Sequence, residues 1–364
     1  MKLAVIGASN AQRPLFLEAR KLGHETIAFA WGANAPFASL ADRYYSISIT
    51  EVGEIVKICR REHIDGVVSN GSNLVARISA QVSDALGLVG NPYSVLSNVA
   101  NKYWVRERTQ DISGLTPVPY GVFSVLTSLG YPCVIKPFVG AGKNGVSFVG
   151  KEEDVKHAVD YANGMGDLIV EKYIEGREIS VESLSCHGVH QVVQITDKSS
   201  TGAPHFVELA HHQPSSLPVV AKEKIRKIVP DILSSIGFQN GASHIELKID
   251  AFDNIYLVEV NPRGGGDEIS STLVDLSTDF GYVRAMIEVA LGIYQPRPSH
   301  DVAHAGICYV CQHTKELLPI YENADLQPWF VKKGVITTLA TLTESVNNRD
   351  RNAYFVYKSS NRMF

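Results

Sequence analysis

The first ninety residues alternate between short apolar runs and segments in which apolar residues recur every three or four positions. The short runs predict buried strands at 3–6, 26–29 and 66–68. The longer spacing predicts helices at 14–22 and 52–60. Strands that alternate with helices favour a parallel sheet covered by helices, an α/β arrangement.

Beyond residue 95 the pattern changes to strand pairs separated by helices. The expected pairs are 132–136 with 146–149, 168–174 with 179–184, and the two halves of 243–261. Helical spacing recurs at 99–108, 151–161 and 221–236. Hairpins mixed with helices favour α+β. A proline-containing break at 294–298 precedes a strand-rich end, so we predict three units, at 1–95, 96–300 and 301–364.

Composition and charge exclude several classes of protein. The chain is 45% hydrophobic and 20% charged, as in ordinary globular proteins. Its 34 Lys and Arg against 38 Asp and Glu give a net charge of −4, which provides no positive field for a nucleic acid. No run approaches the ~18 apolar residues of a membrane span. Five scattered cysteines suit free thiols in a reducing compartment, so we expect a cytoplasmic protein with neither nucleic-acid nor membrane partner.

Polar and apolar side chains alternate along the last predicted hairpin. A turn at 252–253 places Glu246 opposite Glu259, whereas a turn at 253–254 places it opposite Asn261. Both registers put these three polar side chains on one face. The other face is expected to be the core face and carries Ile245, Leu247, Ile249, Tyr256, Val258 and Val260.

Two carboxylates and an amide on one strand face suit a hard cation. Cross-strand neighbours lie ~5 Å apart, so their oxygens converge. Mg²⁺ is usually bound by one or two carboxylates together with substrate phosphates. A solvated strand face is the other interpretation of the same pattern.

A lysine and a glycine-rich loop follow one of the predicted strands. Lys136 ends the strand at 132–136, and Gly140, Gly142 and Gly145 lie in the loop after it. Backbone amides of such a loop can cradle phosphate, and the lysine can meet that phosphate from the sheet. An ordinary hairpin turn is the alternative, because the loop lacks the G-x-x-x-x-G-K-[ST] phosphate-loop motif.

The order of these features resembles the ATP-grasp superfamily of carboxylate–amine and carboxylate–thiol ligases. The resemblance covers residues 1–300 and is most specific between Asn101 and Asp267. The matching segments are Asn101–Arg106, Leu115–Pro119, Tyr131–Pro137 with the glycines that follow, Val170–Glu178, Glu246 and Glu259–Arg263. It implies an ATP-grasp fold with an N-terminal Rossmann-like domain and a small C-terminal β-rich segment.

The resemblance also implies a role for each matched residue. Lys102 and Lys136 would contact the α- and β-phosphates, beneath a loop with Gly140, Gly142 and Gly145. Glu171 and the backbone of Tyr173 and Ile174 would face adenine, and Glu178 the ribose. Glu246, Glu259 and Asn261 would hold Mg²⁺ or Mn²⁺, expected as two ions. Arg263 and Lys136 would be catalytic, because phosphoryl transfer depends on charge stabilisation.

One further segment has two equally favoured interpretations. Residues 207–215 resemble a Glu-x-x-His-x-x-Pro segment of amino-acid ligases, which would place His211 near the metal and phosphates. The same residues also fit a polar loop before the helix at 221–236. The resemblance points to Ser9, Asn10 and residues 71–73 as places where an acceptor would bind.

The implied activity is that of an ATP-dependent ligase, most like the L-amino acid (dipeptide) ligases. ATP would phosphorylate a small-molecule carboxylate, and an amine would attack the acyl phosphate to give an amide, ADP and phosphate. One alternative is a biotin-carboxylase-like or purine-pathway enzyme that activates bicarbonate or formate. Another is an ATP-binding module without catalysis. Relatives are often homodimers, which leaves a homodimer open for this chain.

Overall fold

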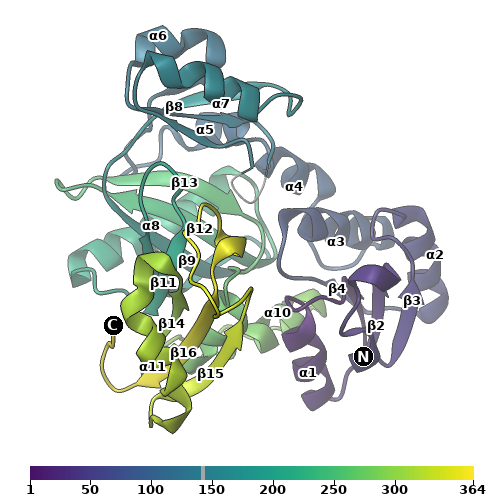
Figure 1. The fold of residues 1–364 in the computed structure, drawn as a ribbon. Helices are drawn as coiled ribbons and strands as arrows, with labels where there is room; N and C mark the ends of the chain where they lie inside the picture. The colour runs from purple at the N-terminus through teal and green to yellow at the C-terminus, as the bar shows by residue number, and fades with distance from the viewer. Residues whose placement is uncertain (141–143) are drawn as a thin grey trace.

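The computed structural model describes residues 1–140 and 144–364, and this part of the chain forms three sheets (Figure 1). The N-terminal sheet is parallel, in the order β3-β2-β1-β4. Its strands are β1 (Lys2–Ile6), β2 (Glu25–Ala30), β3 (Arg43–Ser46) and β4 (Gly66–Val68). Its helices are α1 (Arg13–Lys21), α2 (Val52–Glu62) and α3 (Asn73–Leu86). The predicted helix-covered parallel sheet is therefore confirmed.

Alternation along β1 explains why this sheet is covered on both faces. Leu3 and Val5 pack with α1 and with α10 (Tyr282–Ala290), whereas Ala4 and Ile6 pack with α2 and α3. Successive side chains of a strand point to opposite faces, so a continuous apolar run buries both.

A small antiparallel sheet of four strands, in the order β5-β8-β6-β7, lies at the top of Figure 1. Its strands are β5 (Tyr120–Val122), β6 (Cys133–Pro137), β7 (Ser147–Val149) and β8 (Leu168–Lys172). The nearby helices are α4 (Tyr93–Val99), α5 (Lys102–Thr109), α6 (Leu126–Leu129) and α7 (Val155–Tyr161). The predicted pairing of 132–136 with 146–149 is confirmed as β6 with β7.

The largest sheet has eight strands in the order β13-β12-β9-β10-β11-β14-β16-β15. Its strands are β9 (Arg177–Cys186), β10 (Val189–Ser200), β11 (Glu208–Gln213), β12 (Gly241–Ile249), β13 (Ile255–Asn261), β14 (His304–Val310), β15 (Phe330–Val335) and β16 (Ala353–Ser359). The remaining helices are α8 (Val219–Ser235), α9 (Val274–Ser277) and α11 (Leu318–Glu322).

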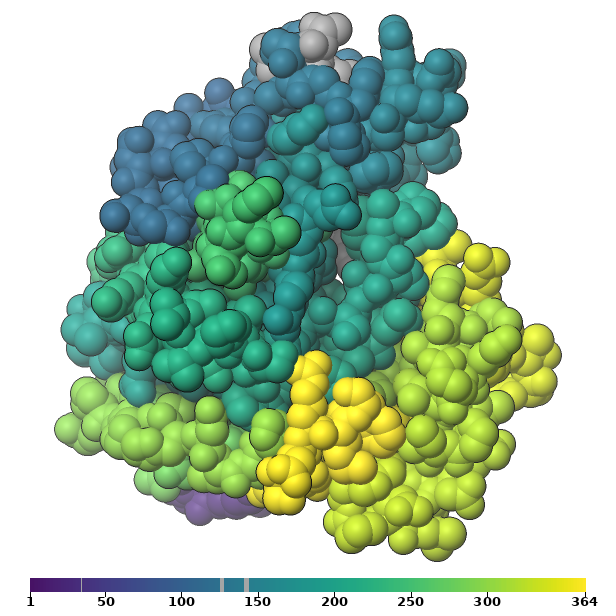
Figure 2. All heavy atoms as spheres, turned by 90° about the vertical axis from the view of Figure 1, so that its left-hand side faces the viewer, coloured from purple at the N-terminus to yellow at the C-terminus, as the bar shows by residue number. Residues whose placement is uncertain are grey.

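Two features of this sheet position the rest of the molecule. Helix α8 packs on the apolar face of β9, β12 and β13, where Ile228 and Leu247 are in the same core cluster. The C-terminal strands extend the sheet through the pairing of β11 with β14. Figure 2 shows these C-terminal residues in yellow and green against the teal body of the molecule. The three domain limits drawn from the sequence stay a prediction.

The helix predicted at 99–108 is interrupted. Asn101 separates α4 from α5, and its side chain accepts hydrogen bonds from the backbone N–H groups of Tyr103 and Trp104 at 3.0 and 3.2 Å. Asparagine is a favoured N-cap because its side chain satisfies the free N–H groups of the first turn. Lys102 consequently occupies the first position of α5.

The predicted pairing of 168–174 with 179–184 is wrong. Strand β8 pairs with β5 and β6, whereas β9 belongs to the large sheet. The chain crosses from one sheet to the other at Gly176, where an added Cβ would overlap the backbone carbonyl of Ile249. Local turn chemistry could not distinguish this crossing from a hairpin.

A β-bulge shifts the register of the acidic hairpin. Glu246 pairs with Glu259, as one of the two predicted registers requires, but the next pair is Leu247 with Leu257. Val258 is therefore the extra residue. The bulge compensates for a turn centred on Phe252 rather than between residues 252 and 253.

The bulge also changes which residues of β13 face the core. Ile255 and Leu257 are buried, and the prediction that Tyr256 and Val258 lie in the core is wrong. The Tyr256 hydroxyl instead donates to Asp250 at 3.0 Å. None of the helices in the described part of the chain has the length and apolar character needed to cross a bilayer.

The close approach at Gly176 can be tested by substitution. We expect Gly176→Ala to lower the free energy of unfolding by roughly 1–3 kcal/mol, because the new methyl group must displace backbone. Gly53 in α2 has open space around its Cβ position and is the matched control. Gly53→Ala should raise the free energy of unfolding by about 0.5–1 kcal/mol. Urea unfolding curves measure both, and equal effects would contradict this account of the crossing.

Candidate active site

A buried carboxylate on the small sheet lies between two cations. Glu171 of β8 accepts from Nε and Nη2 of Arg106 at 2.8 and 3.1 Å, and Lys136 Nζ lies 2.7 Å from its second oxygen. All three side chains are buried. Arg106, on α5, also donates to the carbonyl of Val258 at 3.0 Å, which connects the small sheet to the edge of the large one.

This arrangement keeps Glu171 ionised. Burial raises the pKa of its carboxyl group, but the charges of Arg106 and Lys136 outweigh burial and lower the pKa to about 2. Burial also lowers the pKa of Lys136, against the attraction of Glu171. A buried charge is tolerated only when it is paired and hydrogen-bonded, as these charges are.

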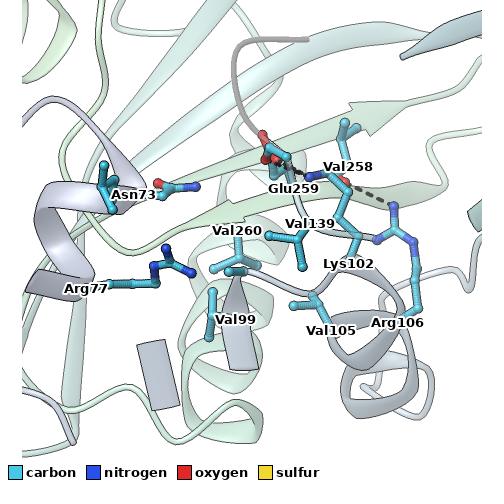
Figure 3. A pocket seen from close by; sticks show the side chains of 13 residues that line it. Asn73, Arg77, Val99, Lys102, Val105, Arg106, Val139, Val258, Glu259 and Val260 are labelled. Atoms are coloured by element: carbon cyan, nitrogen blue, oxygen red, sulfur yellow. Dashed lines mark hydrogen bonds and ion pairs between the residues drawn. The ribbon is translucent and has the colours of Figure 1, made fainter. Parts of the chain in front are cut away.

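A pocket beside this triad is lined by further residues that the sequence predicts to belong to the site. Figure 3 shows Asn73 and Arg77 of α3 on one side, Lys102 and Arg106 of α5 on the other, and Glu259 of β13 between them. Lys102 Nζ lies 3.2 Å from a Glu259 oxygen and donates to the carbonyl of Gly140 at 3.1 Å.

Asn261 and Arg263 lie next to Glu259, at the end of β13. Asn73 donates to Asn261 at 2.9 Å, so the N-terminal unit reaches the predicted metal face. Arg263 donates to the Gly264 carbonyl at 2.8 Å, and its buried Nε has no hydrogen-bond partner among the described residues. Within the described chain this guanidinium forms no ion pair with a carboxylate, so its charge is available to a ligand.

Glu246, opposite Glu259, is surrounded by basic side chains. Lys198 Nζ lies 2.9 Å from Glu246 and 3.1 Å from Glu208. His244 contacts Glu246 at 3.3 Å through Nε2 and Glu182 through Nδ1. Burial lowers the pKa of His244, but the neighbouring Glu182 and Glu246 raise it to about 9. Burial likewise raises the pKa of Glu246, and the positive charges beside it bring that pKa well below its usual range.

Lys248, on β12, contacts three residues of the segment that is predicted to bind the nucleotide. Lys248 Nζ donates to the Ile174 carbonyl at 2.9 Å and lies 3.4 Å from Glu178. The same ammonium lies 4.6 Å from the ring centroid of Tyr173, a cation–π distance. The large sheet therefore contacts the segment that crosses to it from the small sheet.

His211 lies on β11 within a third group of charges. Its Nε2 lies 3.6 Å from Glu208 and 3.6 Å from Asp267, too far for a hydrogen bond. Neither ring nitrogen has a hydrogen-bond partner among the described residues. Burial lowers the pKa of His211, but the carboxylates of Asp267 and Glu208 produce a net increase.

The glycines of the predicted phosphate loop are only partly described. Gly140 lines the pocket of Figure 3, and Gly145 has a positive φ of 71° at a position where a Cβ would meet Met165 and Pro137. Gly142 lies outside the described residues. The roles predicted for these glycines stay predictions.

The donor set on the hairpin fits a hard divalent cation. Glu246, Glu259 and Asn261 offer two carboxylates and an amide oxygen from one face of β12 and β13. Oxygen ligands of this kind suit Mg²⁺ or Mn²⁺. Substrate phosphates would complete such a site beside Lys102 and Lys136.

Several side chains at this site were missed in the sequence. Arg106 follows one helical turn after the predicted lysine of α5, and His244 and Lys248 lie two positions on either side of Glu246 on one strand. Both periodicities place these residues on the faces already identified, so they could have been found. Glu182 reaches His244 through the pairing of β9 with β12, which local sequence does not reveal.

Comparison with known proteins gives a domain match and related sequences. Residues 129–272 match the ATP-grasp domain. A formate-dependent phosphoribosylglycinamide formyltransferase from a Nitratiruptor species is 24% identical over 328 residues, which cover 84% of this chain and 80% of that protein.

Solved structures share the fold over nearly the whole chain. An L-amino acid ligase from Bacillus licheniformis superposes with a TM-score of 0.81 at 23% identity, covering 99% of this chain and 93% of that one. The biotin carboxylase domain of Hydrogenobacter thermophilus 2-oxoglutarate carboxylase, solved with MgADP and bicarbonate, gives a TM-score of 0.76 at 18% identity, covering 99% and 86%. The predicted ATP-grasp fold is confirmed.

The buried triad gives an acid-dependent contribution to stability. The pKa of Glu171 falls from its ordinary 4.5 to about 2 in the folded protein, so its stabilisation is present above pH 4.5 and is lost as the pH falls toward 2. We expect Glu171→Gln to lower the free energy of unfolding by about 3 kcal/mol at neutral pH, because two buried cations lose their partner.

The difference between Glu171→Gln and the wild type should shrink as the pH falls from 4.5. Urea unfolding over this pH range measures the difference. Glu153, whose side chain is 75% exposed, is the matched control, and Glu153→Gln should change little at any pH. A difference that does not depend on pH would contradict ionisation of Glu171.

Proposed function

Because the chain has an ATP-grasp domain and the fold of the ATP-grasp ligases, we propose that it phosphorylates a substrate carboxylate with ATP and joins the resulting acyl phosphate to an amine. The γ-phosphate moves to the carboxylate oxygen, and the amine nitrogen then displaces phosphate to form an amide. The supporting observation is that three cations lie in or next to one region: Lys102 contacts Glu259, Lys136 belongs to the buried triad beside the same pocket, and Arg263 follows Asn261 by two residues. Polyphosphate binding needs this local positive charge, whatever the net charge of the chain.

Each group has a defined task in this scheme. Lys102 and Lys136 bind the phosphates, and Arg263 neutralises charge on the phosphoryl group during transfer. Glu246, Glu259 and Asn261 would hold Mg²⁺ or Mn²⁺, as two ions, which would supply charge neutralisation for the phosphates. The nucleotide base and ribose would lie against the segment that contains Tyr173, Ile174 and Glu178. The Tyr173 ring, the Ile174 carbonyl and the Glu178 carboxylate already contact Lys248.

The order of bond formation also requires that water be kept from the acyl phosphate. Hydrolysis of that intermediate would waste ATP, so the acceptor must bind close to it. Asn73 contacts Asn261 of the metal face directly, and His211 is connected to Glu246 of that face through Glu208 and Lys198. We place the acceptor amine on this side of the site.

A second candidate function differs in the carboxylate substrate that is phosphorylated. The related formyltransferase is named for its dependence on formate, and the superposed biotin carboxylase domain was solved with bicarbonate. Formate and bicarbonate can be activated by the same phosphoryl transfer. Phosphate release with formate and phosphoribosylglycinamide, or with bicarbonate alone, would favour this candidate over an amino-acid ligase.

The proposed reaction can be tested with a substrate panel. The protein is incubated with ATP, Mg²⁺ and pairs of amino acids, and phosphate release and peptide formation are measured together. We expect at least one pair to give both products in equal amounts. If no combination of carboxylate and amine gives turnover while ATP binds, a binding module without catalysis is the better description.

The metal face can be tested by charge-neutralising substitutions. Glu259→Gln and Glu246→Gln should each lower kcat by about 100-fold or more, because a divalent ion contributes several kcal/mol of charge stabilisation. Glu223→Gln, on an exposed part of α8, is the control and should leave kcat unchanged. Turnover of Glu259→Gln equal to that of the wild type would show that the active site lies elsewhere.

A further inference from the structure

An arginine of the C-terminal segment reaches the charged group around His211. Arg351 donates to both oxygens of Asp267 at 2.9 and 3.1 Å, although the two residues are 84 positions apart. A bidentate pair of this kind fixes the orientation of the carboxylate as well as its position. The side chain of Arg351 is only 5% exposed, so the contact is shielded from solvent.

The same loop also holds Glu208 at the start of β11. Asn348 accepts from the backbone N–H of Glu208 and donates to its carboxylate, both at 3.0 Å. Arg351 donates to the backbone carbonyl of Glu208 at 3.1 Å and to that of Asn348 at 2.7 Å. Its guanidinium lies 3.5 Å from the ring centroid of Tyr309. We call Asn348 and Arg351 the clasp.

The two carboxylates held by the clasp both face the same ring nitrogen of His211. His211 Nε2 lies 3.6 Å from each of them, and the His211 side chain is 1% exposed. Asp267 is 26% exposed and Glu208 13%, so both carboxylates keep a surface beyond the clasp. Lys198 then connects Glu208 to Glu246, the predicted metal ligand.

An anchor for the C-terminal segment would not need these partners. The segment is already fixed by the pairing of β14 with β11 and by an apolar cluster that includes Phe355 and Tyr357. A buried guanidinium paired with a half-buried carboxylate adds a desolvation cost that such an anchor could avoid. The clasp instead restricts two acidic groups that border the site.

We propose that Asn348 and Arg351 position Glu208 and Asp267 for the step in which the amine attacks the acyl phosphate. Arg351 acts in this step as a positioning residue. The proposal rests on the proposed function for the reaction, but the geometry of the clasp can be tested without turnover. It assigns the C-terminal segment a part in the acceptor side of the site.

The kinetic test compares three arginine variants with the best substrate pair from the panel. Arg351→Gln should lower kcat/KM for the amine about tenfold or more, because small displacements of positioning groups are costly. The KM for ATP should stay within twofold of the wild type, and more phosphate should be released per amide formed. Arg351→Lys, which keeps the charge but loses the bidentate contact, should lie between. Arg349→Gln is the control, since Arg349 is exposed on the same loop.

Equal losses in the ATP and amine parameters would overturn the proposal, because a merely structural role affects both. Asn348→Ala is the second variant if Arg351→Gln fails to fold, since it removes the contacts with Glu208 and leaves no buried charge unpaired. It should also raise the ratio of phosphate to amide. An unchanged ratio in both variants would likewise overturn the proposal.

The second test follows the ¹⁵N imidazole resonances of His211, assigned by their loss in His211→Gln. The groups that face this ring are Glu208, Asp267, Lys198 across the β10–β11 pair, and the ring of Tyr309. Arg351→Gln should shift the titration of His211 to higher pH, because Asp267 loses its counter-charge and a nearby positive charge disappears. Arg349→Gln should not shift it. An unchanged midpoint of the His211 titration in Arg351→Gln would overturn the proposed role of the clasp. A shifted midpoint in a protein that joins no carboxylate to an amine would support the clasp and refute the proposed function.

Discussion

The carboxylate of Glu171 lies between Arg106 and Lys136, and this buried triad joins three parts of the molecule. Arg106 comes from α5, Lys136 from β6, and the second contact of Arg106 is the carbonyl of Val258 on β13. Buried charges are stable only when their partners are in place, so each element fixes the others. The lysine expected to meet phosphate is therefore positioned by a contact made within the protein.

The same requirement explains the rest of the site. Lys102 pairs with Glu259, Lys198 with Glu246, and Lys248 with Glu178, so each of these cations at the cleft has an acidic partner. Under the proposed function, phosphates would bring negative charge to the lysines while a divalent ion brings positive charge to Glu246 and Glu259. Partners would then be exchanged without leaving any charge buried alone. A balanced cleft of this kind is compatible with a chain whose net charge is only −4.

The sequence predicts well the features that depend on the short repeat of side chains along a strand or a helix. Glu246, Glu259 and Asn261 share a face because side chains alternate along a strand, and that face was found although the bulge at Val258 was not. The bulge leaves no local pattern that separates it from regular pairing. The crossing at Gly176 was missed for a related reason, since a glycine between two strand-like segments is also typical of a hairpin.

Contacts between residues that are far apart in the sequence limit what the sequence can predict. Glu182 meets His244 only because β9 lies between β10 and β12, and Arg351 meets Asp267 only after the C-terminal strands have joined the sheet. The ATP-grasp match ends at residue 272 and contains the lysine strand and the metal face. Asn73, which contacts Asn261, and Arg351 lie outside it on opposite sides. Under the proposed function, the groups that handle the nucleotide lie in the matched segment except for Lys102, which precedes it. The acceptor side combines Glu208, His211 and Asp267 from the matched segment with Asn73 and Arg351 from the flanking segments. Asn73 and Arg351 belong to no motif found in the sequence, which is why motifs point to a reaction that uses ATP while the acceptor must be identified by experiment.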